Sequence, residues 1–121
     1  MARKAYAHDA VVVVDPGGDP AAPGGAVTVA LCGHWDHPPP CPLAPHHTAA
    51  RPAGDTVELR VLFATEPANE KRVRSLIGEA LATGRLNGPD GHITRWTVRS
   101  AQPALVRPDE EDDASRLIAN P

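Results

Sequence analysis

The segment from Cys32 to His47 concentrates side chains that can bind a transition metal. It holds both cysteines of the 121-residue chain, four of its six histidines and one aspartate. Thiolate and imidazole groups are the ligands that zinc and copper prefer in proteins. Five prolines stand in the same segment and stiffen it, because each proline fixes φ and lacks a backbone donor. We therefore expect the chemistry of this chain to lie here.

The best set of metal ligands combines the end of an expected strand with the residues that follow it. Cys32 and His34 are two residues apart, so the period of a strand would place both side chains on one face. Cys41 and His46 come later in the segment. These four side chains would complete a tetrahedral zinc site.

Four further residues of the segment have reserve or supporting roles in this prediction. His37 and His47 are reserve ligands. Asp36 is either a ligand or an acceptor that orients an imidazole, and Trp35 would cover the metal. The spacing includes neither a C-x₂-C knuckle nor the H-x₃₋₅-H pair of a zinc finger. The prediction rests on the density of ligands and not on their spacing.

Zinc is the expected metal, and copper and iron are alternatives, because histidine ligands suit all three. Four protein ligands would close the site and give it a structural role. Three would leave a position for water, whose pKa zinc can lower to about 7. The segment offers more than four ligands, so both arrangements stay open.

Three functions are consistent with these residues. The first is a small cytoplasmic metal-binding protein that holds one zinc-like ion within 32–47. The second is a metal-dependent enzyme, a hydrolase or a lyase, with an open coordination position. Its catalytic residues stay unassigned, because the chain has neither a G-x-S-x-G elbow nor a phosphate-binding glycine loop. The third is an interaction module without metal, in which the proline-rich segment and Trp35 contact a protein partner.

Charge and hydropathy exclude two classes of partner. The formal net charge of −3 comes largely from the acidic block at 109–113, and the remaining charges nearly balance. The chain therefore lacks the basic surface of a nucleic-acid-binding protein. No secretory signal is visible, and no apolar run approaches the ~20 residues that cross a bilayer. We expect a cytoplasmic protein that does not bind membranes and whose cysteines form no disulfide.

Hydrophobic periodicity predicts four strands and one main helix. The strands are expected at 10–14, 26–34, 56–64 and 92–100. The helix is expected over 67–83, because one apolar stripe has the spacing of a helix face and consists of Val73, Leu76, Ile77, Ala80 and Leu81. Gly84 stands where a C-terminal cap is expected, and Gly78 suggests that the helix packs closely at its middle.

This order of elements indicates an α+β fold. The expected architecture is a two-layer sandwich, in which one main helix covers a mainly antiparallel four-stranded sheet in the order βββαβ, with ferredoxin-like pairing as one option. A single domain over 1–108 would include a proline-, histidine- and cysteine-rich loop at 33–54. Residues 109–121 would form an acidic, mobile tail.

One face of such a sheet would stay partly bare, which favours a homodimer. On the strand at 56–64 this face carries Glu58 and Arg60 but also Leu62. Pairing two sheets would bury apolar surface, worth roughly 25 cal/mol per Å².

Overall fold

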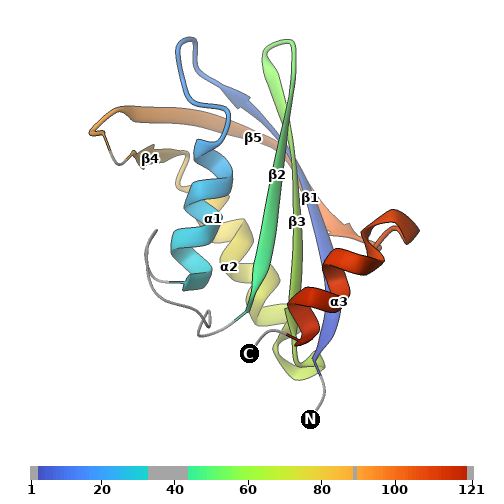
Figure 1. Cartoon of the computed structure of the whole chain (residues 1–121). Helices are drawn as coiled ribbons and strands as arrows, with labels where there is room; N and C mark the ends of the chain where they lie inside the picture. The colour runs from blue at the N-terminus through green and yellow to red at the C-terminus, as the bar shows by residue number, and fades with distance from the viewer. Residues whose placement is uncertain (1–2, 33–43, 89, 120–121) are drawn as a thin grey trace.

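The computed structural model describes residues 3–32, 44–88 and 90–119 and has an α+β fold (Figure 1). Within these residues, a curled antiparallel sheet of five strands is accompanied by three α-helices and two short 3₁₀ turns. The elements are β1 (Lys4–Val14), α1 (Ala22–Cys32), β2 (His46–Ala53), β3 (Thr56–Thr65), η1 (Pro67–Asn69), α2 (Glu70–Ala82), β4 (Arg85–Asn87), β5 (Ile93–Ala104), η2 (Pro108–Glu110) and α3 (Glu111–Ala119).

The strands lie in the order β2-β3-β1-β5-β4, and every neighbouring pair is antiparallel. β3 therefore lies between β1 and β2, and β1 lies between β3 and β5. The register of β1 and β5 shifts between Val11 and Val12, which marks an irregularity in the middle of the sheet. No helix in the described residues is long and apolar enough to cross a bilayer.

The main core lies between one face of the sheet and the helices α1 and α2. The strand at 56–64 is confirmed, and its predicted apolar face supplies Val57, Leu59, Val61 and Phe63 to this core. The predicted main helix is confirmed as η1 and α2, with buried Val73, Ile77, Ala80 and Leu81. These residues are buried because the period of each element puts its apolar side chains on one face.

The predicted four-stranded sheet with one main helix is wrong. The segment expected as a strand at 26–34 forms α1, which begins at Ala22. Residues 22–27 are all buried, and a helix that is apolar on all sides has no stripe to distinguish it from a strand. Asp19 marks the start of α1, because its carbonyl accepts a hydrogen bond from Ala22 N–H at 3.0 Å and its Oδ1 accepts from Ala21 N–H at 2.9 Å.

The second difference is β2, which occupies the last part of the predicted loop at 33–54. Its sequence HHTAARPA does not alternate between apolar and polar residues, and positions 49–53 are all exposed, so the strand had no periodic signal. β2 is an edge strand, where Pro52 is tolerated because a proline lacks only the donor of a backbone hydrogen bond. The strand β4 adds a short hairpin to β5 at the opposite edge of the sheet.

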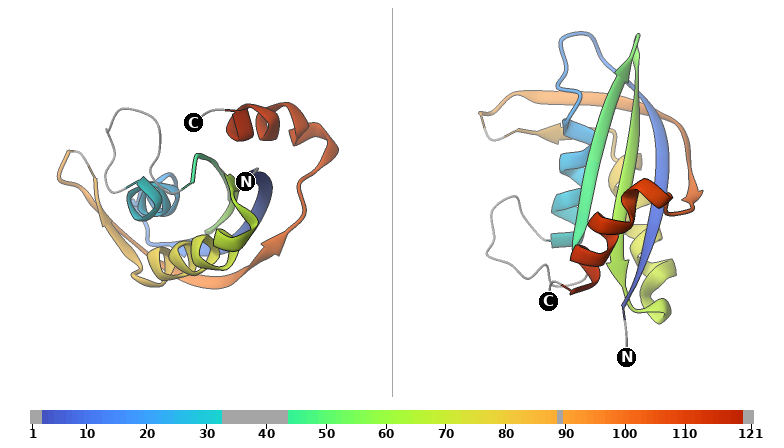
Figure 2. Two further views of the ribbon diagram at one scale, coloured as in Figure 1. Left: turned by 90° about the horizontal axis from the view of Figure 1, so that it is seen from below. Right: turned by 45° about the vertical axis from the view of Figure 1, so that its right-hand side comes forward.

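The acidic segment after residue 108 contains α3, which lies on the face of the sheet opposite α1 and α2 (Figure 2). Ala114 and Leu117 of α3 pack with Ala7 and Leu62 in a second apolar cluster. This cluster explains why an apolar leucine stands on the otherwise polar face of β3. The domain boundary at residue 108 stays a prediction.

Candidate functional site

The structure describes three of the eight residues that the sequence assigns to the metal site. Cys32 is the last residue of α1, so the argument that a strand aligns it with the next ligand is wrong. His46 and His47 begin β2. The other five candidates lie outside the described residues: His34, Trp35, Asp36, His37 and Cys41.

His46 and His47 belong to opposite faces of β2. His46 is paired in register with Phe63, whose side chain lies in the main core, and His47 with Leu62, which packs beneath α3. Residues that pair directly on antiparallel strands share a face, and successive residues alternate. The structure therefore does not bring these two imidazoles together. His46 faces α1, whereas His47 is exposed on the α3 side.

The ring of His46 is held between α1 and the residues before β2. Its Nδ1 lies 3.1 Å from the carbonyl oxygen of Ala44, and its Nε2 lies 3.0 Å from Oγ1 of Thr28. A carbonyl oxygen only accepts, so Nδ1 must carry a proton and donate. In the neutral ring Nε2 then has a lone pair, which accepts the hydroxyl proton of Thr28.

α1 and β2 approach each other closely at this point. A Cβ added to Gly24 would lie 3.1 Å from Oγ1 of Thr48, so glycine is what permits the contact. Among the residues that the structure describes, no three His, Cys, Asp or Glu side chains form a group that could hold a metal ion. Both ring nitrogens of His46 lie within hydrogen-bond distance of a neighbouring group, which fixes the orientation of the imidazole.

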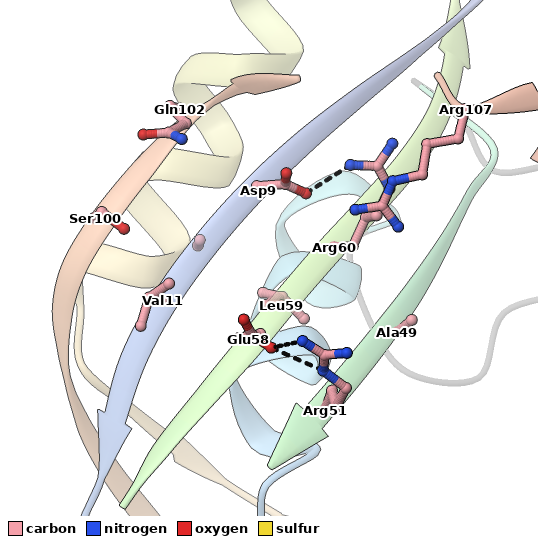
Figure 3. A pocket seen from close by; sticks show the side chains of 11 residues that line it. Asp9, Val11, Ala49, Arg51, Glu58, Leu59, Arg60, Ser100, Gln102 and Arg107 are labelled. Carbon is pink, nitrogen blue, oxygen red and sulfur yellow. Dashed lines mark hydrogen bonds and ion pairs between the residues drawn. The ribbon is translucent and has the colours of Figure 1, made fainter. Parts of the chain in front are cut away.

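A second candidate site is an open pocket on the α3 face of the sheet, which sequence reasoning missed (Figure 3). The pocket has a volume of about 370 Å³ and lies across β5, β1, β3 and β2. Its charged and polar lining consists of Asp9, Arg51, Glu58, Arg60, Ser100, Gln102 and Arg107. α3 covers a different part of this face, so the pocket stays open.

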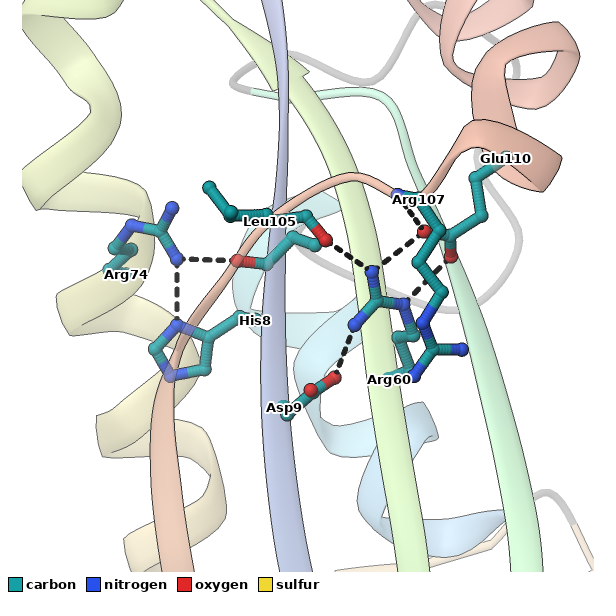
Figure 4. Close-up of polar contacts among 8 residues, drawn as sticks. His8, Asp9, Arg60, Arg74, Leu105, Arg107 and Glu110 are labelled. Carbon is teal, nitrogen blue, oxygen red and sulfur yellow. Dashed lines mark hydrogen bonds and ion pairs between the residues drawn. The ribbon is translucent and has the colours of Figure 1, made fainter.

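Arg60 is the centre of an ion-pair network at the edge of this pocket (Figure 4). Its guanidinium donates two hydrogen bonds of 2.7 Å to the carboxylate of Glu110, one of 2.8 Å to Asp9 and one of 2.6 Å to the carbonyl of Leu105. The bonds from Arg60 lower the pKa of Glu110 to about 2, and the same bonds raise the pKa of Arg60. Both groups are therefore charged at neutral pH.

The other arginine pair in the pocket is more exposed. Arg51 on β2 donates from Nε to Glu58 Oε2 at 2.8 Å, across the neighbouring strand β3. The Arg51 side chain is 79% exposed, so this pair contributes little to stability. Within the pocket, the positive charge of Arg51 and the negative charge of Glu58 therefore offset each other.

His8 on β1 forms a buried contact on the α2 side of the sheet. Nδ1 of His8 lies 3.0 Å from a terminal nitrogen of Arg74, which also donates to the carbonyl of Ala7 at 2.7 Å. A guanidinium only donates, so Nδ1 must accept. Burial and the charge of Arg74 lower the pKa of His8, so its ring is neutral at pH 7. Among the described residues, the charged groups that act on His8 are Arg74 and Asp9. We therefore assign the His8 imidazole a structural role.

The sequence pattern of β3 indicates only part of the ion-pair network around Arg60. The alternation of Glu58 and Arg60 on β3 was visible in the sequence, and it did indicate the polar face. Their partners were not visible, because Asp9 and Glu110 are about fifty residues away and depend on the pairing of strands.

No protein-family model, no curated protein and no solved structure matches this chain.

Proposed function

We propose that this chain is a small metal-binding protein that holds one zinc-like ion with ligands from residues 32–47. The first support is compositional, because seven potential ligand side chains fall within this short segment. The second is the orientation of His46, which carries the proposal. A metal-binding histidine typically donates one ring N–H to a carbonyl or a carboxylate, and this bond fixes the tautomer that leaves the other nitrogen free to ligate.

His46 has this arrangement in its Nδ1–H bond to Ala44. Its Nε2 lone pair is engaged by the hydroxyl of Thr28, which lies within α1. A threonine hydroxyl in a helix can donate instead to the carbonyl four residues earlier, so a metal ion can replace it at low cost. His46 would be the anchor ligand and would bind through Nε2.

A structural role for the ion is the form of this proposal that the fold favours. Cys32 ends α1 and His46 begins the edge strand β2, so an ion bound to both would cross-link two elements. β2 has only one neighbouring strand, and such a link would stabilise it. The alternatives are a metal-dependent hydrolase or lyase and a metal-free interaction module. The proposal includes a cytoplasmic location, with zinc ahead of copper and iron.

Elemental analysis of untagged protein tests the proposal. We expect about one transition metal per chain, as a single tetrahedral site requires. The double substitution Cys32→Ser/Cys41→Ser should abolish retention, and His46→Ala should weaken it, whereas His92→Ala should not, since His92 is an exposed residue of the β4–β5 turn. Protein without metal, or full retention in the double variant, would contradict the proposal.

We also propose that the protein forms a homodimer. α3 covers Leu62 and Ala7, so the surface open to a second copy is smaller than the sequence suggests. Sedimentation at micromolar concentration should show a dimer, and a single species of one chain mass would contradict it.

A further inference from the structure

The pocket on the α3 face contains polar groups that the fold does not use. Arg60 and Arg51 are each paired with carboxylates. The guanidinium of Arg107, by contrast, forms no direct ion pair in the described ranges, although its charge acts on the nearby carboxylate of Glu110, and Ser100 and Gln102 make no side-chain hydrogen bond there. The three exposed side chains border the same hollow.

The position of Arg107 makes it an anion-binding group. Figures 3 and 4 show its guanidinium beside that of Arg60 and directed over the sheet. Arg60 already pairs with two carboxylates, those of Asp9 and of Glu110, and Glu110 lies outside the pocket lining. A guanidinium that has no direct ion pair can still bind an acceptor that takes two of its N–H groups at once, and a carboxylate is such an acceptor.

We propose that this pocket binds a small organic monocarboxylate. The carboxylate would pair with Arg107, the apolar body would lie over Val11 and Ala49, and Ser100 and Gln102 would donate or accept hydrogen bonds at the far side. The pocket volume of about 370 Å³ is near the lower end of the range for small-molecule sites. It suits a ligand of roughly the size of benzoate or hexanoate.

The same lining selects against more highly charged ligands. Asp9 and Glu58 also border the pocket, so a second negative charge on the ligand would face them at close range. A phosphate or a dicarboxylate should therefore bind more weakly than a monocarboxylate. This site is independent of the proposed metal site, since the imidazole of His46 faces α1 on the other side of the sheet.

Backbone amide chemical shifts in the full-length protein test the proposal, with benzoate and hexanoate as probes. Both should bind saturably, with Kd on the order of 1 mM for one partly exposed ion pair and a small apolar contact. The largest shifts should fall at residues that border the pocket, among them Val11, Ala49, Ser100 and Gln102. Benzamide, which has the same shape without the charge, and inorganic phosphate should bind at least about tenfold more weakly, because each lacks the singly charged carboxylate.

Arg107→Gln is the decisive variant. It should weaken benzoate binding by about tenfold, since it removes a charge-assisted pair. The fold should persist, because Glu110 accepts its hydrogen bond from the backbone N–H of Arg107, at 2.8 Å, and not from the side chain. The matched control is Arg85→Gln on β4, an exposed arginine outside the pocket, which should leave binding unchanged.

Three results would overturn the proposal. The first is the absence of saturable binding of both carboxylates. The second is equal binding of benzoate and benzamide, which would mean that the charge is not recognised. The third is benzoate binding that Arg107→Gln and Arg85→Gln affect to the same extent.

Discussion

Arg60 and Glu110, fifty residues apart in the chain, form a two-bond ion pair in which both donor–acceptor distances are 2.7 Å. The side chains are only 13% and 17% exposed, so water competes weakly for the pair. The bonds join strand β3 to η2, the turn that leads into α3. The pair therefore fixes the start of α3 over the sheet, next to the apolar cluster beneath that helix.

Glu110→Gln should loosen this attachment. The substitution keeps the size of the side chain but leaves the guanidinium of Arg60 with one charged partner, Asp9. We expect a loss of about 1–3 kcal/mol in the free energy of unfolding and faster hydrogen exchange in α3. Asp109→Asn is the control, because Asp109 is an exposed neighbour outside the network. Equal stability of the two variants would show that the pair contributes nothing.

The same pair predicts a loss of stability in acid. The folded-state pKa of Glu110 is about 2, below its ordinary value of 4.5. A lowered carboxyl pKa adds stability that is fully present above pH 4.5 and is lost as the pH falls from there toward 2. Urea unfolding between pH 5 and pH 2.5 should show a steeper decline for the natural chain than for Glu110→Gln. Parallel declines would contradict the assignment to Glu110.

His8 predicts a second pH dependence, at higher pH. Its folded-state pKa lies below 6.5, so the unfolded chain binds the proton more readily. Stability should therefore be complete above pH 6.5 and should fall as the pH drops below it. His8→Asn places an acceptor near the position of Nδ1 without titrating, and it should flatten this decline, whereas His92→Asn should not. An imidazole pKa at or above 6.5 by NMR would contradict the prediction.

The elements that the sequence predicts correctly are those with a strong local period. Alternation in β3 and the helical stripe of α2 each bury one face, and the period alone identifies them. α1 was missed because the short run from Val27 to Leu31, apolar except for Thr28, fits a buried helix and a buried strand equally well. β2 was missed because an edge strand beside solvent needs no apolar alternation.

The polar network could not be predicted in the same way. Arg60 meets Asp9 only because β1 and β3 pair in one register, in which Asp9 lies opposite Arg60. A shift of one residue would turn these side chains to opposite faces. The local pattern gives the face of a residue, but its partner depends on tertiary structure.

One glycine within α2 and one just after its end give opposite predictions for substitution by alanine. Gly84 has φ of 69°, and an added Cβ would lie 2.9 Å from the carbonyl oxygen of Trp96. Gly84→Ala should cost about 1–3 kcal/mol, because an L side chain is strained there and meets rigid backbone. The expected close packing at Gly78 is wrong, since an added Cβ meets nothing within 4 Å. Gly78→Ala should stabilise the protein by up to about 1 kcal/mol. Thermal unfolding measures both, and the same sign for both variants would contradict this account.

Metal removal should act on the junction of α1 and β2 and leave α2 unchanged. If His46 anchors an ion, chelation frees its Nε2 and removes the link to Cys32, so amides near Thr28 and Thr48 should exchange faster. Amides near Ile77 should keep their protection, because the main core holds α2 independently. Hydrogen exchange with and without chelator measures this difference. Metal affinity should also fall as the pH drops through the histidine range, because a ligand must lose its proton to bind. Equal exchange at both positions would mean that the ion, where it binds, does not organise this junction.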